Sequence, residues 1–107
     1  ADQGFLSIDA NGVLGGEHST VVERWLGPRP EEGGVIAWIA QVDPSVAAWF
    51  QIGLEALAEG VFPEEVHLAQ LPAELDAGGR PVRIQVDGPG LVPGQRFDVA
   101  FAAPGEA

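Results

Sequence analysis

The sequence predicts an α+β domain in which one long helix packs on a mainly antiparallel sheet. Short apolar segments bounded by turn residues recur along most of the 107 residues, as in antiparallel strands. One segment alone, 44–59, has the length and both end signals of a long helix. Because no repeat or linker divides the chain, we expect residues 1–107 to form a single globular domain with the order β-β-β-β-α-β-β-β.

The first three strands are expected before residue 27. Residues 5–9 partly alternate apolar and polar side chains, and Asn11 and Gly12 can take the positive φ of a hairpin turn, after which a second strand returns. Residues 20–26 are rich in β-branched and aromatic side chains, which favours a third strand. The charged residues within and before this segment would also suit a short helix.

A loop and a fourth strand are expected next. Residues 27–34 contain two prolines and three glycines, which remove amide donors and loosen the backbone. The following segment, 35–42, is apolar almost throughout. Its short length favours a central strand that is buried on both faces.

The long helix has clear signals at both ends. Asp43 can cap free amides, Pro44 suits the first helical position, and Gly60 is a typical helix stop. At ~100° per residue, the apolar side chains between these ends cover about 200° of the helix circumference. This arc is wider than a surface helix needs to cover one sheet.

The remainder is expected to be mainly strand. Proline and two glutamates at 63–65 could open a second short helix, but we favour a strand over 66–71. Residues 81–87 alternate, with Arg83 and Gln85 outward. A turn-rich segment follows, and residues 95–102 are expected to return as the antiparallel partner of 81–87.

The charge balance is strongly acidic, with 16 acidic residues against 5 arginines and a formal net charge of −11. Nucleic-acid binding requires a basic surface, whereas these arginines are scattered beside acidic residues. We therefore predict no nucleic-acid partner and repulsion from anionic membranes. The same charge would attract a basic protein partner.

Residue types and segments that the sequence lacks exclude further kinds of site and of protein. It contains no cysteine, which excludes disulfides, thiolate metal ligands and cysteine nucleophiles. No apolar run approaches the ~20 residues of a membrane span, and no signal peptide is visible. A cytoplasmic location is the default expectation, although a removed leader would leave no trace.

Residues 8–14, Ile-Asp-Ala-Asn-Gly-Val-Leu, follow an apolar segment. They resemble the first motif of the haloacid dehalogenase superfamily, in which an aspartate nucleophile ends a strand and a second aspartate two residues later acts as acid and base. The resemblance implies a nucleophilic role for Asp9, with Asn11 in place of the second aspartate. That superfamily's parallel core does not fit the predicted order of elements, and a hairpin turn accounts for the same residues. The segment also begins like a calcium loop, but Val13 stands where a ligand is needed.

Two histidines are candidates for chemistry. His18 is flanked by Glu17 and Ser19, but neighbours in a strand point to opposite faces, so solvated turn and strand residues are the favoured interpretation. His67 lies near two glutamates, which could form part of a metal site or an acid–base pair, but regular histidine spacing is lacking. We predict no catalytic residue, no metal and no cofactor.

The wide apolar arc of helix 44–59 predicts a non-catalytic, self-associating module, either a homo-oligomer or a subunit of a larger assembly. The expected interface residues are Trp49, Ile52, Ala56 and Trp25. A coat, decoration or accessory subunit would fit, as would an acidic inhibitor or immunity protein. The alternative is a small ligand-binding protein or a hydrolase- or isomerase-type enzyme. Its apolar pocket would lie between helix and sheet, with a carboxylate such as Asp9 or Glu55 as acid and base.

Overall fold

The computed structural model describes residues 3–88 and 96–103. In these residues two strands come first, four helices follow, and three strands end the order. The elements are β1 (Gln3–Ile8), β2 (Leu14–His18), α1 (Thr20–Leu26), α2 (Gly34–Ala40), α3 (Pro44–Glu59), α4 (Glu64–Ala69), β3 (Glu74–Asp76), β4 (Pro81–Asp87) and β5 (Phe97–Ala102). The class is α+β, as the sequence predicts, although the order of elements differs.

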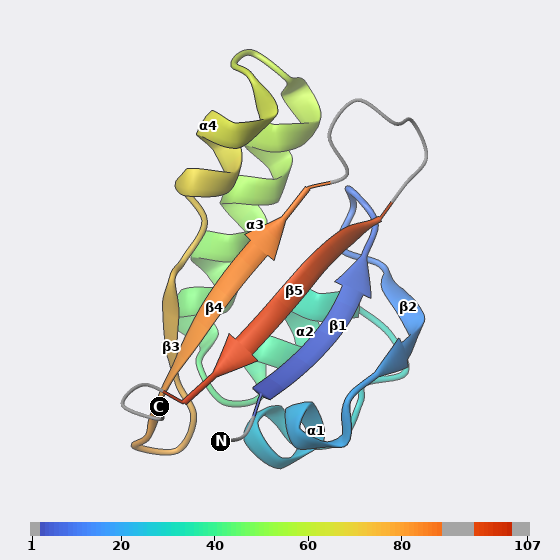
Figure 1. Cartoon of the computed structure of the whole chain (residues 1–107), viewed down its shortest axis with the longest axis vertical. Helices are drawn as coiled ribbons and strands as arrows, with labels where there is room; N and C mark the ends of the chain where they lie inside the picture. Colours follow the sequence, from blue (N-terminus) through green and yellow to red (C-terminus); the bar gives the residue numbers. More distant parts are fainter. Residues whose placement is uncertain (1–2, 89–95, 104–107) are drawn as a thin grey trace.

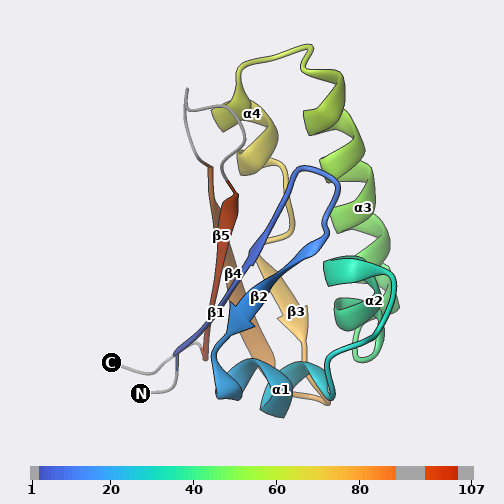
Figure 2. The same ribbon diagram turned by 90° about the vertical axis from the view of Figure 1, so that its right-hand side faces the viewer.

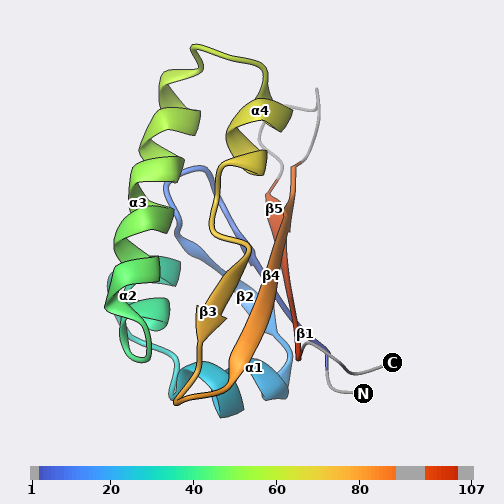
Figure 3. The same ribbon diagram turned by 90° about the vertical axis from the view of Figure 1, so that its left-hand side faces the viewer.

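The five strands form one antiparallel sheet in the order β2-β1-β5-β4-β3 (Figure 1). β1 and β5, from opposite ends of the chain, pair over their full lengths, from Gln3 with Ala102 to Ile8 with Phe97. All four helices lie against the same face of this sheet (Figures 2 and 3). Among residues 3–88 and 96–103, no helix covers the other face of the central strands.

Alternate side chains of the strands are apolar and buried, and they form the sheet side of the core. Leu6 of β1, Val82 of β4 and Val99 of β5 point beneath the helices and are buried, while their sequence neighbours are exposed or only partly buried. From the helix layer, Trp38 and Phe50 are completely buried. Burial of each large apolar side chain contributes about 1.5–3 kcal/mol, so this interface supplies most of the driving force for folding.

Residues 20–26 form helix α1, so the strand expected there is wrong. Buried Val21, Val22, Trp25 and Leu26 follow the spacing of one helix face, and Ser19 is extended at the N-cap. Gly4 allows the close packing of this helix on β1, because a Cβ there would lie 2.9 Å from methyl groups of Val21 and Val22. Burial of this face outweighs the β-propensity of the valines.

Residues 34–40 form helix α2, which corrects the fourth strand expected over 35–42. Val35, Trp38 and Ile39 are buried, in the spacing of one helix face. The helix follows Gly33 and begins with Gly34, both at positive φ, at the end of the expected loop. A short, uniformly apolar run suits either a buried strand or a buried helix, and tertiary packing selects the helix here.

Residues 64–69 form helix α4 rather than the strand favoured over 66–71. Pro63 is its N-cap, and Glu64 and Glu65 occupy the first turn, where negative charge stabilises a helix. This is the short helix that the sequence left open as an alternative. The sheet instead gains β3, a three-residue strand that the sequence pattern did not predict.

Helix α3 has the predicted bounds. An Asp43 side-chain oxygen accepts a hydrogen bond from the Val46 amide, and Gly60 ends the helix in the left-handed conformation. α2 and α4 both pack against α3, so they cover part of the apolar arc that exceeded the needs of one sheet. In the ranges 3–88 and 96–103, no helix is long and apolar enough to span a membrane.

The C-terminal hairpin is present as expected. β4 has the predicted bounds, and its residues 83–87 pair with residues 98–102 of β5. The strand end expected at Gln95, and most of the turn-rich segment before it, lie outside the described residues.

Candidate functional site

Exposed apolar side chains gather on α3 and on the segment that follows it. Seven large apolar side chains are exposed in the described part of the chain. Five of them are Trp49, Ile52, Val61, Phe62 and Val66. Isolated exposed apolar residues are ordinary, whereas a concentration within two neighbouring helices and their connection makes this region a candidate for a binding surface.

One side of α3 faces away from both the sheet and α2. At ~100° per residue, this outer face of α3 consists of Ser45, Ala48, Trp49, Ile52, Ala56 and Glu59. Ile52 is 66% exposed and Trp49 is 53% exposed, while Ala56 is half-buried. Because small side chains border these two large ones, a second helix can approach the backbone of α3 closely.

Trp49 is held in place although half of its surface is exposed. Its indole Nε1–H donates a hydrogen bond of 2.9 Å to the backbone oxygen of Gln70, the C-cap residue of α4. The bond joins α3 to α4 and limits the orientation of the ring. A large aromatic side chain that is already ordered loses little conformational entropy when a partner covers it.

The structure places Trp25, the fourth predicted interface residue, elsewhere. It is 7% exposed and belongs to the hydrophobic core through the buried side of α1. Trp25 is therefore not part of the outer face of α3.

Asp9 stabilises the turn between β1 and β2. Its Oδ1 accepts hydrogen bonds from the Asn11 amide at 2.8 Å and from the Val13 amide at 3.0 Å. Gly12 has a φ of 83°, whereas Asn11 does not take the positive φ that the sequence allowed. The segment that resembles a haloacid dehalogenase motif is thus a hairpin turn in an antiparallel sheet.

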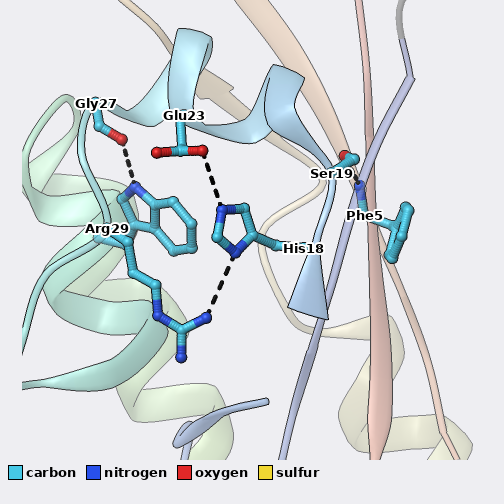
Figure 4. Close-up of polar contacts among 7 residues, drawn as sticks. Phe5, His18, Ser19, Glu23, Gly27 and Arg29 are labelled. Atoms are coloured by element: carbon cyan, nitrogen blue, oxygen red, sulfur yellow. Dashed lines mark hydrogen bonds and ion pairs between the residues drawn. The ribbon is translucent and has the colours of Figure 1, made fainter. Parts of the chain in front are cut away.

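His18 is at the centre of a polar cluster (Figure 4). Its Nε2 lies 3.2 Å from Glu23 Oε2, and its Nδ1 lies 3.4 Å from Arg29 Nη1. A guanidinium can only donate, so Nδ1 accepts and Nε2–H donates to Glu23. The ring meets Trp38 edge-on at 5.0 Å, and its side chain is only 17% exposed.

This environment corrects the expected setting of His18. The residue is partly buried and has side-chain partners, so it is not a solvated strand residue. The carboxylate that reaches it is Glu23 rather than the neighbouring Glu17 (Figure 4). The Ser19 hydroxyl instead accepts a hydrogen bond of 2.8 Å from the Phe5 amide of β1. The adjacent serine, histidine and glutamate therefore do not form a nucleophilic set.

Glu23 and Arg29 are partners of His18 that the sequence interpretation missed. One feature of the sequence could have revealed the contact with Glu23. Ser19 is a residue type typical of helix N-caps, and Glu23 follows His18 by five residues, within the first turn of a helix that Ser19 would cap. A helix starting at Thr20 turns Glu23 back toward the end of β2. The assignment of residues 20–26 as a strand concealed this geometry.

Arg29 also lines an open groove of about 720 Å³. Residues 11–14, which comprise the β1–β2 turn and the first residue of β2, form one wall. Residues 29–34, which lead into α2, form the other wall. Gly12 and Val35 connect the two walls through a backbone hydrogen bond of 2.9 Å. Glu55 lies beside a different, smaller hollow of about 320 Å³ between α3 and the same turn.

His67 is 5% exposed, and its Nε2 accepts a hydrogen bond of 3.2 Å from the Phe62 amide. Its ring centroid lies 5.8 Å from that of Phe62, so the histidine packs beneath the connection between α3 and α4. Within the described ranges, no three histidine, aspartate or glutamate side chains are grouped so that they could hold a metal ion.

Comparisons of the chain with protein-family models, with curated proteins and with solved structures gave no match. The outer face of α3 and the cluster around His18 are therefore the two candidate sites of the described residues.

Proposed function

We propose that the chain is a non-catalytic, self-associating protein-interaction module whose contact surface is the outer face of α3. The observation that carries the proposal is the exposure of Ile52 and Trp49 among small side chains. Aromatic and large aliphatic anchors at the centre of a patch typically supply most of the binding energy of an interface. An accessory or coat subunit of a larger assembly would use such a surface.

A second copy of the chain fits this surface because the pattern of side-chain sizes is self-complementary. α3 spans 44–59, so Ile52 lies at its middle. In an antiparallel pair of α3 helices, a two-fold axis between residues 52 and 53 places Trp49 opposite Ala56 of the partner subunit. The largest side chain then meets one of the smallest, and the contact occurs twice, as an isologous dimer requires.

The charge distribution along α3 favours the same arrangement. Glu55 and Glu59 lie in the C-terminal half, and the first turn contains no acidic residue. Antiparallel pairing keeps Glu55 and Glu59 of one helix away from the same residues of the other helix. Parallel pairing would instead place like charges opposite each other.

The pocket alternative has less support. This alternative was based on the apolar surface of helix 44–59, which is wider than contact with one sheet requires. α2 and α4 cover part of that surface. Asp9, one of its candidate carboxylates, is used by the turn amides. We therefore propose no second function between helix and sheet.

Sedimentation analysis of wild-type protein and two charge variants tests the proposal. Ile52→Glu places a carboxylate at the centre of the outer face, and Gln51→Glu adds the same charge at the next exposed position, about 100° around the helix. We expect wild-type protein and Gln51→Glu to dimerise between micromolar and millimolar concentration. We expect Ile52→Glu to remain monomeric with an unchanged circular dichroism spectrum.

A wild-type protein that stays monomeric throughout this range would overturn the proposal. Equal association of Ile52→Glu and Gln51→Glu would exclude the outer face of α3 as the contact. If Ile52→Glu unfolds, Ile52→Ser serves as a milder variant, and undiminished association of folded Ile52→Ser would also contradict the proposal.

A further inference from the structure

Asn11 is the only asparagine in the chain, and a glycine follows it. Both residues lie in the turn between β1 and β2, where Asn11 is exposed. An asparagine side chain loses ammonia when the backbone nitrogen of the next residue attacks its amide carbon. Glycine favours this attack because it has no Cβ beside the nitrogen and its backbone adopts the most conformations. The pair therefore has the chemistry and the exposure of a covalent modification site.

The reaction at this pair has two steps. The Gly12 nitrogen loses its proton and bonds to Asn11 Cγ, and the Cγ–Nδ2 bond breaks to release ammonia, which leaves a five-membered succinimide ring. Water then opens the ring at one of its two carbonyl carbons. One opening gives aspartate, and the other gives isoaspartate, in which the main chain runs through Cβ and Cγ. The balance is one water consumed and one ammonia released, and a carboxylate replaces a neutral amide.

Hydrogen bonds to Asp9 restrain the reacting nitrogen and the backbone around it. The Gly12 amide donates to the backbone oxygen of Asp9 at 3.0 Å. The Asp9 side chain accepts from the Asn11 amide at 2.8 Å and from the Val13 amide at 3.0 Å, both at Oδ1. To attack Cγ, the Gly12 nitrogen must leave its acceptor while the backbone of Asn11 rotates, because reacting atoms have to approach in line with the bond that forms. The bonds at Oδ1 oppose this rotation.

We propose that Asn11 is a site of spontaneous deamidation and that Asp9 sets its rate by holding the turn closed. The reaction is slow while the bonds to Asp9 persist, and it proceeds from the fraction of molecules in which the turn opens locally. Asp9 is thus a positioning residue that restrains a reaction of its neighbour.

The isoaspartate product is incompatible with the present contacts of the turn. It adds one atom to the main chain between residues 11 and 12, so the Gly12 carbonyl has to move. This carbonyl oxygen accepts the 2.9 Å hydrogen bond from the Val35 amide in the first turn of α2. The new carboxylate also lies in the lining of the groove that contains Glu31 and Glu32, which repel it. Modification therefore weakens the attachment of α2 to the turn.

Mass spectrometry of protein incubated at pH 8, with peptide mapping of the product, measures the reaction. We expect the mass gain from exchange of NH₂ for OH to occur at Asn11, slowly in folded wild type and faster in urea. Folded Asp9→Ala should react about 10-fold faster than folded wild type, because two hydrogen bonds that keep the turn closed are lost. The control Asp87→Ala removes the same charge at the exposed end of β4 and should react like wild type.

A second substitution confirms the position of the reaction. Asn11→Gln in the Asp9→Ala background should abolish the early mass gain, since the longer side chain has to close a less favourable six-membered ring. If Asp9→Ala unfolds, Asp9→Ser replaces it, because the hydroxyl can accept one of the two bonds, and its rate should be intermediate. The proposal is overturned if unfolded wild type shows no gain at Asn11. Equal rates in folded and unfolded wild type, or in the folded Asp9 and Asp87 variants, would also overturn it.

Amide hydrogen exchange of the purified isoaspartyl protein tests the effect on α2. We expect faster exchange of the Val35 amide than in wild type. Asn11→Asp carries the new charge without the additional main-chain atom, so its Val35 amide should keep most of its protection. Equal protection in the isoaspartyl protein and wild type would contradict the release of α2. Self-association through α3 is a separate matter, and Ile52→Glu should deamidate at the wild-type rate.

Discussion

The indole of Trp49 on α3 and the backbone oxygen of Gln70 at the end of α4 are joined by a hydrogen bond of 2.9 Å. The bond connects the two helices at a position where half of the indole surface faces solvent. Trp49 therefore has two roles in our account. It stabilises the packing of α4 on α3, and it presents an ordered apolar surface to a second copy.

Trp49→Phe separates these two roles. The substitution removes the N–H donor and keeps an aromatic ring, so we expect the fold to persist with a free energy of unfolding lower by about 0.5–1.5 kcal/mol. Urea unfolding followed by circular dichroism at a concentration where the protein is monomeric measures this loss. A variant as stable as wild type would show that the bond to Gln70 does not stabilise the monomer.

Asp43 connects the start of α3 to the edge of the sheet through its two carboxylate oxygens. Oδ1 accepts from the Val46 amide at 3.1 Å, and Oδ2 accepts from the Asp76 amide of β3 at 2.9 Å. Asp43→Ala removes both acceptors and should lower the free energy of unfolding by about 2–3 kcal/mol, more than the loss of a simple helix cap.

The matched variant Asp43→Asn keeps one carbonyl oxygen as an acceptor. We expect roughly half of the loss caused by Asp43→Ala, measured by the same urea titration. If both variants lose the same stability, the two oxygens do not act separately.

Gly34 lies where α2 starts against the β1–β2 turn. Its φ is +63°, and a Cβ at this position would overlap the carbonyl oxygen of Gly12. Gly34→Ala should therefore lower the free energy of unfolding by about 2–4 kcal/mol, since both the backbone conformation and the close approach are lost.

Gly16 of β2 is the control, because a Cβ there would have no neighbour within 4 Å and the φ is not positive. Gly16→Ala should be neutral or stabilise by about 0.5–1 kcal/mol. Thermal unfolding of both variants provides the comparison. Similar losses in the two would contradict the steric explanation for Gly34.

Local chemistry explains which elements could be predicted from the sequence. Asp43 and Gly60 act on adjacent backbone groups, so the ends of α3 were predictable without knowledge of the tertiary structure. The alternation of residues 81–87 is equally local. By contrast, residues 20–26 and 35–42 are apolar segments whose conformation depends on what covers them, and propensity alone favoured the wrong state.

The candidate site was predictable to the same limited extent. The wide apolar arc of α3 pointed to Trp49 and Ile52, whose exposure in the structure agrees with a surface role. The arc could not reveal that α2 and α4 cover part of it, since both were assigned as strands. The strand assignment for residues 20–26 could not show that Trp25 is buried or that Glu23 reaches His18, because both depend on the helical turn of α1.

Disulfide trapping at position 52 tests the central claim, self-association through α3, most directly. The chain has no cysteine, so a single Ile52→Cys substitution gives one reactive thiol per molecule. A two-fold axis beside this position brings the two thiols within the short range that a disulfide requires. We predict rapid, nearly complete formation of a covalent dimer under mild oxidation for Ile52→Cys, and slow, partial formation for the neighbouring exposed control Gln51→Cys. Equal rates of cross-linking for the two variants would contradict the proposed dimer.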